Sequence, residues 1–352
     1  MNTSISEGQC QLIDKVISRG ICVKCGACVG ICPYFDYFDG KIVVLDRCTS
    51  DTWRCLQICP RSDYDNTSLR RIREQDQASG IGPYQKIFMA RSTKEEIIEK
   101  AQYGGVVSTL LIYAVEKGLI ESAIITDKGN GISSAGSLAK NRSDILKCAG
   151  SRYNAAGGLS ALNRAIKENE KKLAVVGLPC QMEALARMSL MEPDGKERVN
   201  HVSLKIGLFC TWALDYRQLT EYLKNSGIEK PVKRYDIPPP PSQIFLAITE
   251  QGLREFPLEE IRPFIQKGCS LCGDMTAEHA DISVGSVEGL EGWNTVVVRN
   301  KKAGDIMQAA IDDQFIEIDQ LPEENLEHLK EASLNKREKS KIAAEEMKRR
   351  EP

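Results

Sequence analysis

The chain has 352 residues, of which 42% are hydrophobic and 27% charged, and its formal net charge is −2. This length allows two or three domains, and the near-neutral charge gives no electrostatic basis for binding nucleic acid or an anionic membrane. The longest apolar stretch, Val106 to Val115, is about half a membrane span, so no direct membrane insertion is expected. Thirteen cysteines, seven of them between Cys22 and Cys59, favour metal ligation over disulfides. We therefore expect a protein that is cytoplasmic or peripheral on a membrane complex.

Residues 1–19 are predicted to form a short helix or arm, and residues 20–63 a ferredoxin-like iron–sulfur domain. The first cysteine run has the ligand spacing of bacterial ferredoxins: Cys22, Cys25, Cys28, and Cys32 followed by Pro33. In that pattern three thiolates of a run hold one 4Fe-4S cube, and the fourth ligates the other cube. Zinc sites usually pair two ligands before a long gap, so the spacing favours iron–sulfur over a zinc site or a disulfide scaffold.

The second cysteine run lacks one member of the ferredoxin pattern. It contains only Cys48, Cys55 and Cys59, the last followed by Pro60. We assign Cys59 to the first cube, together with the ligands Cys22, Cys25 and Cys28. The second cube then has Cys32, Cys48 and Cys55 and needs a fourth ligand. Asp51 stands closest to the vacant place in the sequence; the alternatives are Cys10, a three-iron cluster, or no second cluster.

Residues 64–83 are polar and charged, end in Gly-Ile-Gly-Pro, and are predicted to be a linker. Residues 84–322 alternate between strand-like and helix-like segments, which predicts an α/β core with an α+β mixed sheet. The pattern Ser92-x-x-Glu95 predicts a helix with a capping box, and Gly104-Gly105 a break before a second helix. Residues 323–352 mix both signs of charge, which favours a tail helix that clasps the domain or a partner over a nucleic-acid tail. The predicted strands cover 86–90, 123–126, 172–176, 202–209, 243–249 and 295–299.

Four further cysteines stand where sites in α/β folds usually form. Cys180 lies at a predicted strand–helix turn and Cys210 at a predicted strand end, and the carboxyl ends of strands line the sites of open α/β sheets. Cys269 and Cys272 form a C-x2-C pair that could complete a four-thiolate site. A zinc site, or buried free cysteines, would explain the same residues. The chain has no GxGxxG and no P-loop motif, so neither a Rossmann dinucleotide site nor a phosphate-binding P-loop is indicated.

Several segments, in order along the chain, resemble the coenzyme F420 hydrogenase/dehydrogenase beta-subunit family. They span about residues 84–340: 102–107, 149–153, 177–181, 207–210, 268–274, 277–286 and 292–295. The resemblance implies a flavoprotein core in which Cys180, Cys210, Cys269 and Cys272 bind a 4Fe-4S cluster beside an FAD. It also implies an FAD pocket made by Gln102, Gly104, Gly105, Ser108, Ser151, Arg152, Tyr153, Pro179 and Gln181. Within this pocket, Arg152 is the preferred contact for the phosphate or the ring.

The resemblance also implies hydride exchange between coenzyme F420 and FAD, followed by single-electron transfer through three 4Fe-4S clusters, the second ferredoxin cluster being the uncertain one. A flavin belongs between the two because it handles electrons both in pairs and singly. Positioning of the rings suffices for this chemistry, so no catalytic acid or base is assigned. The implied partner is the catalytic subunit of a formate dehydrogenase or hydrogenase, a heterodisulfide reductase, or a respiratory F420H2 dehydrogenase. The alternatives are a reductase of the same family that uses NAD(P)H or ferredoxin, and a non-catalytic ferredoxin-type carrier with a structural zinc domain.

Overall fold

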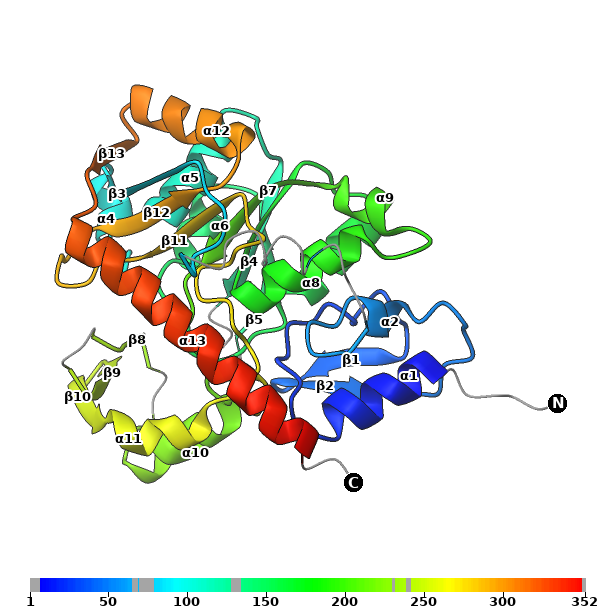
Figure 1. Cartoon of the computed structure of the whole chain (residues 1–352). Coiled ribbons are helices and arrows are strands. Elements are labelled where there is room, and N and C mark those ends of the chain that lie inside the picture. The colour runs from blue at the N-terminus through cyan, green and yellow to red at the C-terminus, as the bar shows by residue number, and fades with distance from the viewer. Residues whose placement is uncertain are drawn as a thin grey trace.

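An eight-stranded mixed sheet forms the centre of the molecule (Figure 1). The computed structural model describes residues 7–64, 69, 79–127, 134–229, 232–238 and 242–349, so most of the predicted linker 64–83 and both extreme termini lie outside the described residues. The strand order is β13-β3-β12-β11-β7-β6-β4-β5. Neighbours among β11, β7, β6 and β4 pair in parallel, and all other pairs are antiparallel. The strands are β3 (Lys86–Ser92), β4 (Ser122–Asp127), β5 (Ala135–Ala139), β6 (Leu173–Gly177), β7 (Val202–Leu208), β11 (Ile282–Ser286), β12 (Asn294–Val298) and β13 (Ile316–Asp319).

Helices cover both faces of this sheet because its central strands are apolar on both sides. In β4, Ala123 and Ile125 belong to one apolar cluster, whereas Ile124 between them belongs to another, as the alternation of side chains along a strand requires. The first cluster joins the sheet to α5 (Val106–Glu116), α6 (Arg142–Lys147) and α12 (Lys301–Asp312). The second joins it to α7 (Gly158–Lys167) and α8 (Pro179–Ser189), which α9 (Gly195–Val199) follows. The predicted mixed α/β architecture is confirmed.

The start of α5 confirms one local prediction, and the preceding helix corrects another. Gly105, with φ of 73°, is the residue before the first turn of α5, so the glycine pair does mark a helix start. The predicted capping box at Ser92 is wrong. Ser92 is the last residue of β3, and α4 (Glu95–Ile98) begins after Lys94 without a side-chain cap. The Ser92 hydroxyl accepts a hydrogen bond from the Lys94 amide at 3.1 Å instead, because the strand continues further than the pattern suggested.

Residues 7–63, hereafter the N-terminal segment, pack around an apolar cluster of their own that includes Leu12, Phe35 and Leu56. The segment lies beside α8 and α9 in Figure 1. Its hairpin pairs β1 with β2 in antiparallel fashion, and short helices flank it. The elements are α1 (Glu7–Leu12), the π-helical turn η1 (Ile13–Ile17), β1 (Phe35–Phe38), β2 (Lys41–Val44) and α2 (Arg54–Gln57).

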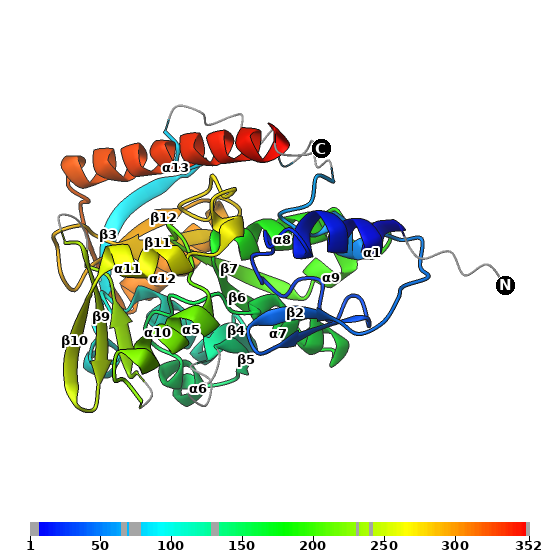
Figure 2. The ribbon, with the colours of Figure 1, turned by 90° about the horizontal axis from the view of Figure 1, so that it is seen from below.

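A smaller antiparallel sheet, with the order β10-β9-β8, extends from the other side of the core (Figure 2). It packs on two helices around the fully buried Phe245. The predicted strand at 243–249 belongs to this sheet rather than to the central one. The elements are α10 (Tyr216–Asn225), β8 (Arg234–Asp236), β9 (Ile244–Thr249), β10 (Gly252–Pro257) and α11 (Leu258–Ile261).

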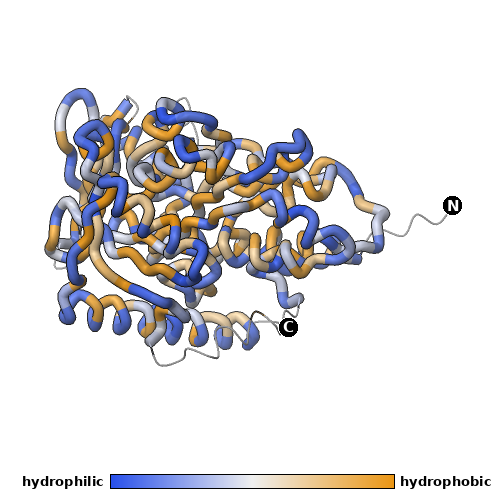
Figure 3. Tube along the Cα trace, turned by 90° about the horizontal axis from the view of Figure 1, so that it is seen from above, coloured by the Kyte–Doolittle hydropathy of each residue, from blue (hydrophilic) through white to orange (hydrophobic). Residues whose placement is uncertain are grey.

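The C-terminal helix α13 (Glu323–Arg349) crosses the outside of the core and ends near the N-terminal segment (Figures 1 and 2). Figure 3 shows it with blue and orange turns, whereas the strands inside are mostly orange. Its Ser333 is fully buried, Arg337 pairs with Glu278 at 2.8 Å, and Met347 packs on the apolar cluster of the N-terminal segment. The predicted tail helix is therefore a clasp on the domain. Among the described residues, no helix combines the length and apolar character needed to cross a bilayer.

A pair of glycine substitutions tests the contact between the core and the N-terminal segment. In Gly268→Ala the new methyl group would collide with the Ile21 carbonyl, so we expect a loss of about 1–3 kcal/mol in the free energy of unfolding. Gly304→Ala is the control, because the site is helical and a methyl group there would lie 3.5 Å from Val298. It should gain up to about 1 kcal/mol. Chemical denaturation of the anaerobically purified protein measures the free energy of unfolding of both variants. Equal changes in the two variants would contradict the close contact between Gly268 and the Ile21 carbonyl.

Candidate functional site

The structure brings four predicted ligands, Cys180, Cys210, Cys269 and Cys272, together around one cavity. We call these four residues the core thiol site. Cys180 lies in the first turn of α8, directly after β6, and Cys210 directly follows β7. Since β6 and β7 are parallel neighbours, both residues emerge at the same edge of the sheet. Cys269 ends the 3-10 turn η3 (Lys267–Cys269), and Cys272 follows three residues later.

Cys272 is buried and the other three core thiols are half-buried, and reduced contact with water opposes the negative charge of a thiolate. Burial raises the pKa of Cys180 well above its ordinary value, and the neighbouring thiols of Cys25 and Cys272 raise it further. Burial likewise raises the pKa of Cys210 to about 12, although Lys336 partly opposes that shift. Among the described residues, no three His, Cys, Asp or Glu side chains are arranged to hold one metal ion. The four thiols line one cavity.

Two cationic side chains, Arg61 and Lys336, line the same cavity. Burial alone would lower the pKa of each, but the neighbouring thiolates, with Glu183 beside Arg61, raise both above their ordinary values. Arg61 belongs to the N-terminal segment, and Lys336 lies on α13. No motif in the sequence pointed to either residue, because each reaches the site from an element outside the central sheet.

The predicted ligands of the first cube also converge. Cys22, Cys25, Cys28 and Cys59, hereafter the first N-terminal group, line a second cavity. Burial raises the pKa of Cys59 to about 11, and the Cys22 thiol adds to the shift. Gly26, with φ of 82°, permits the close approach, because a Cβ there would lie 2.7 Å from the Gly157 carbonyl oxygen.

Cys32, Cys48 and Cys55, hereafter the second N-terminal group, form another cluster of thiols. Burial raises the pKa of Cys32, and the neighbouring Cys48 thiol raises it further. Burial raises the pKa of Cys55 to about 12, and Cys32 and Cys48 contribute. The position of a fourth ligand stays a prediction: Asp51 is exposed, and Cys10 lies half-buried on α1.

Three predicted flavin-pocket residues meet in one polar network around Asp236 of β8. Gln102 donates from Nε2 to Asp236 at 2.7 Å and to the Tyr153 hydroxyl at 3.2 Å. Gln102 also accepts from the Ser151 amide at 3.0 Å. Tyr103 and Tyr153 donate their hydroxyls to Asp236 at 3.2 and 3.3 Å. Burial and then Asp236 raise the pKa of Tyr103 to about 12. Sequence reasoning missed Tyr103 and Asp236, since Asp236 comes from the smaller sheet.

Two arginines beside this network carry buried donor atoms without a hydrogen-bond partner. They are Arg152, through Nη2, and Arg234 of β8, through Nε. The Nη1 of Arg152 donates to the Ser151 carbonyl at 2.8 Å, so the guanidinium is held near the polar network. Arg234 had no sequence signal. Such orphaned cationic donors suit an anionic group such as a phosphate.

The remaining predicted pocket residues lie in two places. Gly104 packs closely on β3, where a Cβ would be 2.8 Å from the Ala90 carbonyl oxygen, and Ser108 follows Gly105 in the first turn of α5. Pro179 and Gln181 lie along the core thiol site instead, at the start of α8. The chain from 151 to 156 joins the two places, because Ala155 and Ala156 line the cavity of the core thiol site.

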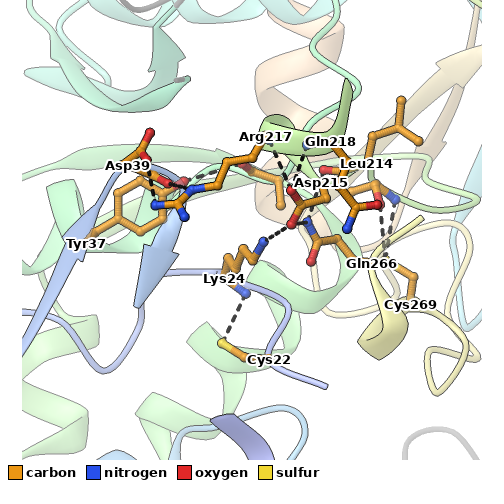
Figure 4. Close-up of polar contacts among 12 residues, drawn as sticks. Cys22, Lys24, Tyr37, Asp39, Leu214, Asp215, Arg217, Gln218, Gln266 and Cys269 are labelled. Carbon is orange, nitrogen blue, oxygen red and sulfur yellow. Dashed lines mark hydrogen bonds and ion pairs between the residues drawn. The ribbon is translucent and has the colours of Figure 1, made fainter. Parts of the chain in front are cut away.

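A series of polar contacts fixes the first N-terminal group against the core (Figure 4). The Lys24 amide donates to the Cys22 sulfur at 3.4 Å, and its Nζ donates to Asp215 at 2.6 Å. Asp215 also accepts from the Gln266 side chain at 3.3 Å. The Cys269 sulfur accepts from the Ala213 amide at 3.4 Å, and the Gln266 amide donates to the Ala213 carbonyl at 2.9 Å. Both thiol groups are thereby tied to one rigid loop.

Comparison with known proteins shows similarity over most of the chain. Residues 87–163 match the family model for the coenzyme F420 hydrogenase/dehydrogenase beta subunit N-terminus, and residues 170–324 match its C-terminus. The coenzyme F420 hydrogenase subunit beta of Methanosarcina barkeri is 32% identical over 76% of this chain and 94% of its own length. A chain of the solved F420-reducing [NiFe] hydrogenase complex from Methanosarcina barkeri superposes with a TM-score of 0.70 at 31% identity. That match covers 76% of this chain and 93% of the hydrogenase chain.

A longer relative shows the same similarity. The coenzyme F420-dependent sulfite reductase of Methanocaldococcus jannaschii is 32% identical over 84% of this chain. The alignment covers only 47% of that reductase, so this chain spans about half the length of the relative.

The contact between Lys24 and Asp215 gives a testable coupling. Both side chains are largely buried, so Lys24→Met and Asp215→Asn should each cost about 1–3 kcal/mol of unfolding free energy. The double variant should cost less than the sum. Burial alone would raise the pKa of Asp215, but the hydrogen bond and charge of Lys24, together with the backbone amides of Gln218 and Arg217, outweigh burial and lower this pKa. The coupling should therefore be complete above about pH 4, the ordinary carboxyl range, and disappear as pH falls below it. Denaturation at several pH values measures this, and additive costs at pH 7 would contradict it.

Proposed function

Because the chain belongs to the coenzyme F420 hydrogenase/dehydrogenase beta-subunit family, we propose that it is the F420-linked electron-transfer subunit of an oxidoreductase complex. One observation carries the proposal. Four cysteines that span 92 positions of the sequence, from Cys180 to Cys272, line a single cavity, and the polar network beside it contains arginine donors without a hydrogen-bond partner. When bound, FAD would exchange hydride with coenzyme F420 and single electrons with iron–sulfur clusters.

In this proposal the core thiol site holds one 4Fe-4S cluster. Four cysteine thiolates are the usual ligand set of such a cube, and these four line one cavity. The cations Arg61 and Lys336 offset part of the thiolate charge. The chain's contribution is to present the four sulfurs, keep water out, and hold these cations in place.

The flavin would occupy the region between the polar network and the core thiol site. Arg152 and Arg234 would pair their free donors with its phosphates, and Gln102 and Tyr153 offer polar groups for the ring or ribityl chain. Support for this placement comes from the segment 151–156, which contacts the network at one end and the thiol cavity at the other. No acid or base is assigned, because hydride exchange needs orientation of the rings above all.

The N-terminal segment would continue the path for electrons. We propose that residues 20–63 form a ferredoxin-like domain with two clusters. The remaining parts are the linker 64–83, the flavin-binding core 84–322 and the helix 323–352. Cys25 belongs to the first N-terminal group and also lines the cavity of the core thiol site. Cys55 belongs to the second group and also lines the cavity of the first. The three thiol groups are therefore contiguous, in the order core, first, second.

A path of this kind needs an acceptor or donor at its far end, which supports a partner subunit with its own catalytic centre. The similarity to a hydrogenase beta subunit favours a hydrogenase-type or formate-dehydrogenase-type partner. The similarity to half of a sulfite reductase favours a reductase partner, since the other half of that relative has no counterpart in this chain. The proposed partners also include heterodisulfide reductase and a respiratory F420H2 dehydrogenase.

Iron content tests the core thiol site. Anaerobically purified protein should contain about twelve iron atoms per chain if all three groups hold cubes. Cys180→Ala should remove about four of them and leave the signals of the N-terminal clusters, as measured by iron analysis and electron paramagnetic resonance. Cys148→Ala is the matched control and should change neither. Zinc in place of iron, with no flavin, would instead identify a ferredoxin-type carrier with a structural zinc domain.

Reduction of the bound flavin tests the hydride donor. Reduced coenzyme F420 should bleach the flavin absorbance of the anaerobic protein, whereas NADH, NADPH and reduced ferredoxin should do so far more slowly. Arg152→Gln should weaken FAD retention by about tenfold to a hundredfold, because one charged hydrogen bond is worth about 1.5–3 kcal/mol.

Arg142→Gln is the control for the flavin measurement, since Arg142 pairs only with surface carboxylates of Glu96 and Glu116 among the contacts of the described residues. Purified protein without flavin absorbance would refute the proposal. Rapid bleaching by a nicotinamide or ferredoxin, with none by F420, would favour the alternative reductase.

A further inference from the structure

We propose that Arg61 and Lys336 are positioning residues that set the reduction potential of the core thiol site, each delivered from a segment that flanks the family-matched region. The inference rests on the proposed cluster at Cys180, Cys210, Cys269 and Cys272. The matched residues are 87–163 and 170–324, so Arg61 precedes them and Lys336 follows them. The core supplies the thiols, and its two flanks supply the charge that faces them.

Arg61 is anchored so that its guanidinium stays at the cavity. It comes two residues after Cys59, and its side chain is only 5% exposed. Its Nε donates to the Gly268 carbonyl at 2.9 Å, directly before Cys269, and its Nη1 to the Pro60 carbonyl at 2.5 Å. The Glu183 carboxylate lies 3.9 Å away, yet it is shared with Arg187 at 3.1 Å. The buried Nη2 of Arg61 has no hydrogen-bond partner.

Lys336 reaches the other side of the cavity from α13. Its Nζ donates to the Cys210 carbonyl at 2.5 Å and to the Asp274 carbonyl at 2.7 Å. Both acceptors are backbone oxygens, so the ammonium keeps its full positive charge next to the thiols. The helix holds the lysine in this position through the adjacent Arg337, whose ion pair with the buried Glu278 spans 2.8 Å. The carboxylates of Asp274 and Glu278 oppose the positive charge on this side of the cavity.

A reduced cluster with four thiolates carries more negative charge than the oxidised one, so a nearby cation favours reduction. In a dry site this attraction is stronger than at the surface. Arg61 and Lys336 should differ in reach. Arg61 follows Cys59 by two residues and lines the cavity that Cys25 shares with the core thiols, whereas the Lys336 ammonium is held by the carbonyls of Cys210 and Asp274. The two cations therefore predict different patterns of potential shift.

The test is a potentiometric titration of the full-length holoprotein, followed by electron paramagnetic resonance. Lys336→Gln should disfavour reduction of the core cluster by roughly tenfold, which is about 59 mV for a one-electron couple, and leave the N-terminal clusters unchanged. Arg61→Gln should lower the potentials of both the core cluster and the first N-terminal cluster. Lys336→Arg and Arg61→Lys should restore most of each shift, because they keep the charge.

Two variants control for structural damage. Lys341→Gln removes an exposed lysine from the same helix, and Arg217→Gln removes the ion pair between α10 and Asp39 of the N-terminal segment. Neither should move a potential. If the Gln variants lose iron but the charge-conserving variants retain it, the site requires the charge, which supports the inference.

Unchanged potentials in iron-replete Gln variants would overturn the inference and leave the proposed function intact. Equal loss of iron in the Gln variants and the charge-conserving variants would also overturn it, because shape rather than charge would then matter. If the unaltered protein contained no iron at the core site, the proposed function itself would fall.

Discussion

The parallel pairing of β6 with β7 is the constraint on which the site depends. Their register places Gly177 opposite Gly207, and each glycine stands three residues before a core cysteine, Cys180 or Cys210. Both glycines are closely packed: a Cβ at Gly207 would collide with Ala277, and one at Gly177 would lie 2.8 Å from the terminal methyl group of Met182, which would have to move. The strand ends are thereby fixed close to the turns that follow them, and two thiols from distant parts of the chain meet at one edge of the sheet.

The two flanks of the core depend on this edge as well. The loop that contains Gly268 meets the Ile21 carbonyl of the N-terminal segment, and the residues after it accept α13 through Lys336. A turn needed for Cys269 and Cys272 is thus also the surface on which both flanks pack. The flanks carry Arg61 and Lys336 into the cavity. The packing of the flanks on the core therefore also determines the positive charge at the thiol site.

The sequence predicted those parts of the molecule whose signal is local. Cysteine spacing and strand ends located the thiols, and the glycine pair marked the start of α5. The roles of Asp236 and Arg234 could not be predicted from the sequence, because both residues come from a strand of three residues in a separate sheet. Arg61 and Lys336 were missed for the same physical reason: a charged residue near a cysteine or on a solvated helix has no pattern of its own. The Ser92 capping box was wrong because the pairing of β3 with β13 reaches Ser92 and keeps that residue in the strand.

The position of Arg61 links cofactor binding in one segment to electrostatics in the other. In the proposed arrangement Cys59 closes the first N-terminal group, and Arg61 follows it by two residues. Ligation of Cys59 would therefore fix the backbone from which Arg61 reaches Glu183 and the Gly268 carbonyl. Loss of metal at the first N-terminal group would release that backbone and remove a cation from the core thiol site. In that arrangement, metal binding at the first N-terminal group and positive charge at the core thiol site would be thermodynamically linked in both directions.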